Sequence, residues 1–227
     1  MHPEQEFGWG RGKENARRLG YDGEWLERLP EVIWESSVAV GNPFSVGPVH
    51  PGETVIDFGC GAGADVCVAA LLVGHRGRVI GVDVTPAMVE KARANAALAG
   101  FSNVEIVEAD IADLSCPDSC ADVVLSNGAI SLSQRKACVL KEALRVLKSG
   151  GRLQIADIVR DNDEAQPTSE PQGTSGSWAN CVTGTLAPQC FQEMLSKAGF
   201  EQVSFFGLTR YRTSAVTAGG TFRARKA

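Results

Sequence analysis

The chain has 227 residues, a length that suits one domain with a sizeable hydrophobic core. Its 44% hydrophobic and 22% charged residues are typical of a globular protein, and the net charge of −5 argues against a nucleic-acid-binding surface. No segment has the apolar length of a signal peptide or a membrane span. We therefore expect a cytoplasmic monomer or homodimer that acts on a small molecule, with no nucleic-acid or membrane partner.

The seven cysteines are an odd number, and in a reducing compartment they indicate free thiols without a disulfide framework. Cys116 and Cys120 are four residues apart but lack a second pair of metal ligands. With only three histidines in the chain, we expect no metal site.

Residues 1–45 are expected to form a helical extension or lid, ahead of a ligand-binding domain over residues 46–227. Two short helices are predicted between Lys13 and Pro30, broken at Gly20 and ended at the proline. The aromatic residues of this extension can cover a ligand or hold the extension to the core, and the second use is favoured. They are Trp9, Tyr21, Trp25 and Trp34. A turn follows at Val40-Gly41-Asn42-Pro43, which places Asn42 near the mouth of a pocket.

The segment from Thr54 to Asp83 predicts a strand, a glycine turn, a helix and a second strand. Residues 54–58 are short and rich in β-forming residues, residues 59–63 permit a tight turn, and residues 64–73 have helical periodicity. Asp83 follows the second strand, residues 78–82, where a carboxylate can accept hydrogen bonds from both hydroxyls of a ribose. This unit predicts a nucleotide-binding pocket.

Charge decides between two ligand classes for this turn. The spacing Gly59-x-Gly61-x-x-Ala64 fits the dinucleotide fingerprint with alanine as its third small residue. However, residues 52–74 contain no Lys or Arg to meet a pyrophosphate, whereas Glu53, Asp57 and Asp65 put three carboxylates in or around the turn. Carboxylates attract an ammonium or a sulfonium. The predicted cofactor is therefore S-adenosylmethionine, and an NAD(P)-binding oxidoreductase is the less favoured alternative.

Helices and strands alternate along the rest of the chain. Helices are predicted over residues 87–99, 133–147 and 188–198, and strands over residues 104–107, 121–125, 152–158, 201–208 and 221–225. Residues 148–151 are expected to stop a helix, residues 160–177 to form a loop, and residues 218–220 to join the last two strands. The predicted fold is α/β and Rossmann-like, with a seven-stranded, mostly parallel sheet and a C-terminal antiparallel hairpin.

Ligands of open α/β sheets bind outside the carboxyl ends of the strands. Asp110 follows the third strand, where it can meet an adenine edge, and Asn127 and Gly128 follow the fourth, between cofactor and substrate. The predicted cofactor-binding residues are Asp57, Gly59, Cys60, Gly61, Gly63, Asp83, Val84, Met88, Ala109, Asp110, Ile111, Asn127 and Gly128.

The pattern Asp-x-Gly-x-Gly-x-Gly at residues 57–63, together with Asp83, resembles the first two signature motifs of class I S-adenosylmethionine-dependent methyltransferases. From about residue 40 to residue 200 the chain is similar to the arsenite methyltransferases. The similar segments are Val40–Pro43, Arg78–Met88, Leu125–Asn127, Arg145–Arg152, Ala156–Val159 and Asn180–Thr185. The last of them looks like the family segment with an arsenic-binding cysteine, which implies that Cys181 is a thiolate ligand. Where the family has another such cysteine, after the Ser-Asn pair, this chain has Gly128, and residues 38–42 contain none.

The resemblance implies methyl transfer to a small acceptor, either trivalent arsenic or another small organic molecule. Methyl transfer from a sulfonium is an in-line displacement, so the protein chiefly has to align and dehydrate the reactants. The expected catalytic residues are Cys181 and Asn127, and the expected substrate contacts are Asn42, Gly128, Ser131, Trp178 and Cys181. A protein that binds the cofactor without turnover is a further alternative.

Overall fold

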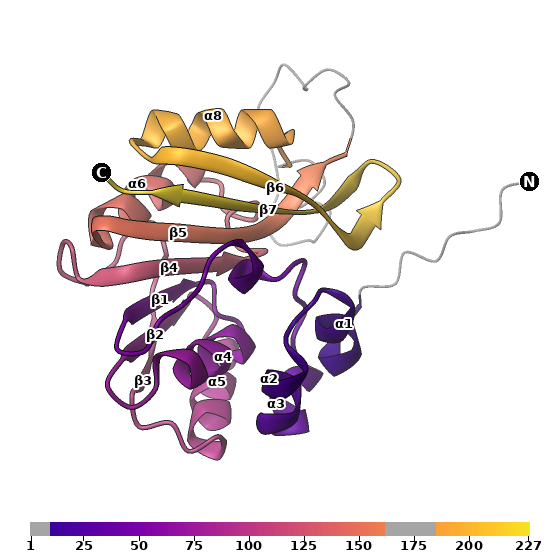
Figure 1. Ribbon diagram of the computed structural model, residues 1–227, viewed down its shortest axis with the longest axis vertical. Coiled ribbons are helices and arrows are strands. Elements are labelled where there is room, and N and C mark those ends of the chain that lie inside the picture. The colour runs from indigo at the N-terminus through magenta and orange to yellow at the C-terminus, as the bar shows by residue number, and fades with distance from the viewer. Residues whose placement is uncertain (1–9, 162–184) are drawn as a thin grey trace, which may run out of the picture.

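The computed structural model of the protein describes residues 10–161 and 185–227. Seven strands form one sheet in the order β3-β2-β1-β4-β5-β7-β6 (Figure 1). The strands are β1 (Thr54–Phe58), β2 (Arg78–Asp83), β3 (Val104–Glu108), β4 (Ala121–Asn127), β5 (Leu147–Arg160), β6 (Glu201–Ser214) and β7 (Thr217–Arg225). The first five strands pair in parallel, and β7 runs antiparallel between β5 and β6. The predicted fold class is confirmed.

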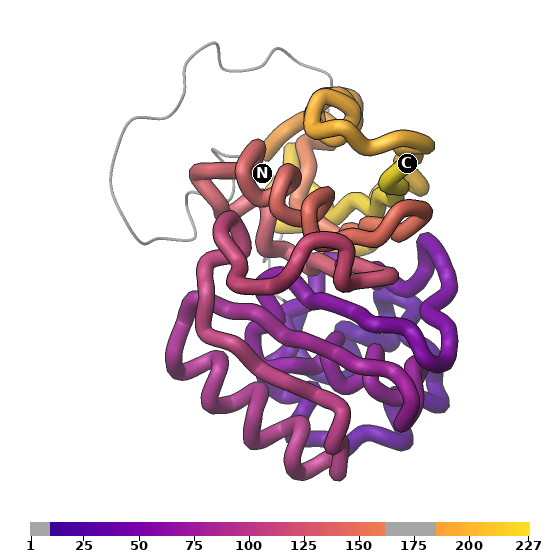
Figure 2. Tube along the Cα trace, turned by 90° about the vertical axis from the view of Figure 1, so that its left-hand side faces the viewer, coloured from indigo at the N-terminus to yellow at the C-terminus, as the bar shows by residue number. Residues whose placement is uncertain are grey.

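Two pairs of helices cover the two faces of the sheet, because the central strands are apolar on both sides. Val55 of β1 faces a core that contains the apolar residues of α4 (Ala64–Val73) and α5 (Pro86–Leu98). Its neighbour Ile56 faces the opposite core, with α6 (Lys136–Val146) and α8 (Pro188–Ala198). The first half of the chain fills the lower part of the molecule and the C-terminal strands fill the upper part (Figure 2). None of the helices in the described ranges is long and apolar enough to span a membrane.

Three short helices and a 3-10 turn precede the sheet. They are α1 (Gly12–Arg18), α2 (Gly23–Arg28), α3 (Glu31–Glu35) and η1 (Pro43–Val46). The predicted pair corresponds to α1 and α2, and Asp22 caps α2 by accepting a 2.8 Å hydrogen bond from the Glu24 N–H. The predicted end of the second helix before Pro30 is confirmed, because α2 ends at Arg28. Helix α3 was not predicted, and its N-cap is Pro30, a position where the missing N–H costs nothing.

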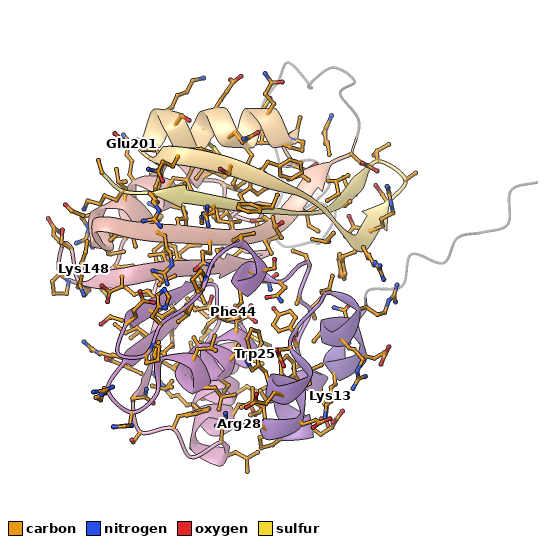
Figure 3. All side chains as sticks on the ribbon, viewed as in Figure 1. Lys13, Trp25, Arg28, Phe44, Lys148 and Glu201 are labelled. Carbon is orange, nitrogen blue, oxygen red and sulfur yellow. The ribbon has the colours of Figure 1, made fainter. Side chains whose placement is uncertain are left out.

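The aromatic residues of the extension hold it to the rest of the fold. Trp34 is completely buried in the core beside α4 and α5, and its ring meets that of Tyr21 edge-on, with 5.7 Å between centroids. Trp25 and Phe44 make a similar contact at 5.5 Å, which ties α2 to η1 (Figure 3). The favoured use of these aromatics, as attachment to the core, is confirmed for these residues, and Trp9 lies outside the described range.

Glycines misled the prediction at two places in the sheet. The helix before residues 148–151 ends at Val146, as predicted, but these residues already belong to β5. Leu147 pairs with Ala121 of β4, and the N–H of Gly150 donates to Lys226 O. Gly219 lies inside β7 rather than in a joining turn. A Cβ at Gly219 would come 2.1 Å from the carbonyl oxygen of Val40, so the glycine serves the close approach of the N-terminal segment.

Candidate cofactor and substrate site

The glycine turn between β1 and α4 has left-handed backbone at each of its three glycines. The φ angles are 75° at Gly59, 52° at Gly61 and 86° at Gly63. At Gly59 a side chain is also excluded by space, because a Cβ would lie 2.3 Å from the Cβ of Ala129. The turn is anchored to β2, since the N–H groups of Gly59 and Cys60 both donate to Val82 O, at 2.8 and 2.9 Å. These glycines therefore leave the backbone at the carboxyl edge of the sheet free of side chains, as a ligand requires.

Asp83 connects the second strand to this turn. Its carboxylate accepts hydrogen bonds from the Gly61 N–H and the Thr85 N–H, both at 2.9 Å. Each carboxylate oxygen can accept a second bond, so both remain able to receive a ribose hydroxyl. The predicted ribose contact stays a prediction, with its geometry available.

Asp57 is a buried carboxylate that lacks a partner within the described ranges. It lies on β1 just before the turn, is 2% exposed, and accepts no hydrogen bond from any described residue. Burial, followed by the charges of Asp65 and Asp83, holds the pKa of Asp57 well above its usual value. A buried polar group without a partner is costly, and a ligand with a cationic donor would satisfy it.

Asp65, in the first turn of α4, is a second buried carboxylate, 8% exposed, that connects three parts of the chain. It accepts a 2.7 Å hydrogen bond from the hydroxyl of Tyr21 and a 2.9 Å hydrogen bond from the side-chain amide of Asn127. The amide nitrogen of Asn127 also donates to Gly41 O at 3.0 Å, and its oxygen accepts from the Val40 N–H at 3.0 Å. Asn127 therefore docks the N-terminal segment onto the end of β4.

One part of the predicted acidic turn is wrong. Glu53 precedes β1 and therefore lies at the opposite edge of the sheet, where Arg152 donates to both of its oxygens at 2.9 and 2.6 Å. The carboxylates that gather at the turn are Asp57, Asp65 and Asp83, and the charges of the last two raise the pKa of Asp57. None of these three forms an ion pair with a Lys or Arg in the described ranges, so the turn is negative.

Cys60 lies close to the same carboxylates and is nearly buried. Burial and the charges of Asp57 and Asp83 raise the pKa of its thiol far above the usual value. A raised pKa makes this thiol a poorer thiolate ligand than an ordinary cysteine at neutral pH.

The residues predicted to hold adenine lie after β2 and β3. Ala109 donates its N–H to Asp83 O at 3.1 Å, which joins the two strand ends. Asp110 is exposed, accepts from the Ala112 N–H at 2.8 Å and forms an ion pair with Arg135. Val84 is 68% exposed, whereas Met88 and Ile111 are half-buried. The structure gathers these residues at the predicted edge, and their contact with adenine stays a prediction.

The residues predicted to contact substrate have different surroundings. Gly128 has a φ of 71°, and a Cβ there would lie 3.5 Å from Cγ1 of Val40. The side chain of Asn42 is already engaged, because it accepts from the Phe44 N–H at 3.0 Å and donates to Gly20 O at 2.8 Å. Ser131 is buried, and its N–H donates to the carboxylate of Asp157 at 3.0 Å. Trp178 and Cys181 lie outside the described residues.

A family model described as a methyltransferase domain matches residues 49–199. That span contains the seven-residue acidic glycine motif, Asp83 and the ends of β3, β4 and β5. The chain belongs to the methyltransferase domain family.

Among curated proteins, the arsenite methyltransferase of Halobacterium salinarum is 38% identical over 188 residues, which cover 83% of this chain and 47% of that protein. The arsenite methyltransferase of Aquipseudomonas alcaligenes is 36% identical over 66% of this chain and 44% of its own length. This chain thus spans about half the length of these relatives.

Solved structures of methyltransferases are also similar to this chain. An arsenic(III) S-adenosylmethionine methyltransferase from Chlamydomonas reinhardtii superposes with a TM-score of 0.68 and 28% identity, over 96% of this chain and 75% of that one. A phosphoethanolamine N-methyltransferase of Haemonchus contortus, solved with S-adenosylhomocysteine, has a TM-score of 0.69 at 16% identity, over 86% of this chain and 55% of that one. At 16% identity, the similarity to the Haemonchus contortus structure shows a shared fold alone.

Proposed function

We propose that the chain binds S-adenosylmethionine at the acidic glycine turn and catalyses transfer of its methyl group to a small acceptor. One observation carries the proposal: Asp57 is buried at the turn without a hydrogen-bond donor from the described residues. A ligand with an ammonium group supplies both the donor and the missing positive charge. A dinucleotide would bring a pyrophosphate beside three carboxylates, which is unfavourable.

Each residue at the edge of the sheet has a separate task in this proposal. Asp57 receives the ammonium, Asp83 the ribose hydroxyls and Asp110 the adenine edge. Bound S-adenosylmethionine supplies a methyl group on a positively charged sulfur. Asn127 keeps the N-terminal segment docked through Val40 and Gly41, and this segment shields the acceptor side from water.

Trivalent arsenic is the first acceptor to test. Two curated relatives and one solved structure similar to this chain are named as arsenic methyltransferases, and arsenic prefers thiolate ligands. Gly128 offers no thiol, and the raised pKa of the buried Cys60 thiol disfavours it as a substitute. Cys181, which lies outside the described residues, is therefore the main predicted arsenic ligand. For this reason, the test also includes other small acceptors.

The test is a methyl-transfer assay with the whole chain and labelled S-adenosylmethionine. One set of reactions contains arsenite with a thiol reductant, and a second set contains small organic amines, phenols and thiols. We expect mass spectrometry to detect methylated arsenic, or else one methylated organic acceptor. Tight cofactor binding without a methylated product in any reaction would instead indicate a non-catalytic binding protein.

Cys181→Ser separates the acceptor from the cofactor. If Cys181 is the arsenic ligand, the variant loses arsenite methylation while its Kd for S-adenosylmethionine stays unchanged, because the cofactor residues are untouched. Cys138→Ser is the matched control, since Cys138 is an exposed thiol on α6. Retained arsenite methylation in Cys181→Ser would contradict the thiolate role.

A further inference from the structure

Helix α5 buries one polar side chain in a stripe that is otherwise apolar. Its buried residues are Val89, Ala92, Asn95 and Ala96, and Asn95 is 4% exposed. Asparagine is a poor helix former, and a buried amide is costly unless its polar atoms are hydrogen-bonded. The amide of Asn95 therefore needs a partner outside α5.

That partner is the glycine turn between β1 and α4. The side-chain amide nitrogen of Asn95 donates to Ala62 O at 2.9 Å, although the two residues are 33 positions apart in the sequence. One turn of helix earlier, Ala92 lies directly against the same segment, because a Cβ at Gly63 would come 3.1 Å from the Ala92 Cβ. Helix α5 thus supports the turn through one hydrogen bond and one close contact.

The hydrogen bond from Asn95 completes the fixing of one peptide unit of the turn. The carbonyl of the Ala62–Gly63 peptide accepts from Asn95, and its N–H donates to Cys60 O at 2.9 Å. The N–H of Ala62 itself, in contrast, donates to none of the described residues. A backbone N–H in a buried turn needs an acceptor, and a ligand at the turn can supply it.

We propose that Asn95 is a positioning residue of the cofactor site, which holds the Ala62 carbonyl on α5 and so keeps the glycine turn in its ligand-binding shape. The inference rests on the proposed function, because it takes the ligand of the turn to be S-adenosylmethionine. Three glycines give this turn access to many other conformations. Without the bond, the binding of the cofactor would have to order the turn, and this ordering weakens affinity.

Asn95→Ala removes the bond and leaves α5 a good helix former at that position. The measurement is calorimetric titration of the whole chain with S-adenosylmethionine. We expect the Kd to rise by about tenfold, the effect of one lost hydrogen bond to a buried acceptor. Urea unfolding of the same variant shows whether it is folded under the conditions of the titration.

Asn103→Ala is the matched control, because Asn103 makes the same kind of bond at the opposite end of α4. Its side-chain amide donates to Gly74 O and Gly77 O, at 3.0 and 3.1 Å. The variant should lose stability, but a Kd refers to the folded protein and is not changed by a lower stability alone. We expect its Kd to stay within about twofold of the wild-type value, since the site is distant.

A second measurement uses the unmodified chain, so it decides the question even where Asn95→Ala is too unstable to titrate. Nuclear magnetic resonance follows the exchange of the Asn95 side-chain amide protons with solvent, in the presence of S-adenosylmethionine. If the bond to Ala62 O holds the turn in the complex, these protons should exchange slowly.

Any of three results would overturn the inference. They are an unchanged Kd in Asn95→Ala, an equal rise in Kd in Asn103→Ala, and rapid exchange of the Asn95 amide protons in the complex. A failure of the proposed function looks different, because the wild-type chain would then give no binding heat with S-adenosylmethionine.

Discussion

At the residue scale, the burial of Asp57 should cost stability that its replacement restores. The folded state binds the Asp57 proton more tightly than the unfolded state does, because burial raises the pKa of Asp57. The free energy of unfolding therefore falls as pH rises from the unfolded pKa through the folded pKa. Such a loss of stability is expected of a carboxylate that binds a ligand, the role that we propose for Asp57.

Asp57→Asn should raise the free energy of unfolding of the ligand-free protein at about pH 8. Each tenfold difference in proton affinity is worth about 1.4 kcal/mol, and we expect a gain of about 1–3 kcal/mol that disappears below about pH 3, where aspartate is protonated in both states. Urea unfolding at the two pH values measures it. A variant less stable than the wild type at about pH 8 would show that Asp57 has a stabilising partner.

The glycines of the turn allow a matched comparison. Gly59→Ala meets both a left-handed backbone and the side chain of Ala129, whereas Gly61→Ala has nothing within 4 Å and meets the backbone cost alone. We expect losses of about 2–5 kcal/mol for Gly59→Ala and about 1–2 kcal/mol for Gly61→Ala in the free energy of unfolding. Equal losses in denaturant titrations would mean that the Gly59 position has room.

Local sequence patterns identified the candidate site residues that lie close to one another in the sequence. The glycine turn, Asp57 and Asp83 all lie within one unit of strand, turn, helix and strand, so spacing and charge were enough. The contacts of Asp65 were not accessible in this way, because its partners Tyr21 and Asn127 are 44 and 62 residues away. Glu53 was assigned to the turn from the charge of the whole segment. That charge does not indicate at which end of a strand each side chain lies.

At the element scale, a few buried polar groups dock the N-terminal helices. Asn127 and Asp65 bind the backbone and Tyr21 of that segment, while Gln154 of β5 donates to Pro43 O and Gly47 O at 3.0 and 2.7 Å. Through these bonds, β4 and β5 contact residues of the N-terminal segment that are distant in the sequence. The described part of the extension is therefore held against α4, β4 and β5.

Tyr21→Phe tests this docking. Removal of the hydroxyl leaves Asp65 with a single hydrogen bond and should destabilise the docked segment by about 1–3 kcal/mol, because a buried acceptor loses its donor. Limited proteolysis should cleave residues 10–45 faster in the variant. Arg17→Ala, which removes only an exposed ion pair of α1, is the control and should be cleaved at the wild-type rate.

Hydrophobic periodicity located most elements, and glycine was the main source of error. The helix over residues 64–73 and the strand over residues 54–58 have the predicted bounds, because their apolar patterns match a buried helix and a buried parallel strand. Gly150, Gly151 and Gly219 suggested turns but lie in strands. These glycines make close contacts with Lys226, Asp122 and Val40. Because these partners are distant in the sequence, local patterns could not predict the contacts.

At the scale of the whole molecule, the parallel half of the sheet presents its polar side chains at one edge. Asp57, Asp83, Asp110 and Asn127 come from the ends of β1, β2, β3 and β4, which are adjacent in the sheet. The antiparallel strands β7 and β6 extend the sheet beyond β5. Strand β7 also contacts η1, because Arg223 donates to Val46 O at 2.9 Å. The topology thus collects the acids that make the site attractive to a cation.

A calorimetric titration compares the two ligand classes on the unmodified chain, with S-adenosylmethionine in one experiment and NADPH in the other. A turn with three carboxylates and no paired base among the described residues should bind the sulfonium compound saturably and give no heat with the dinucleotide. Saturable binding of NADPH, together with no binding of S-adenosylmethionine, would contradict the assignment of this pocket.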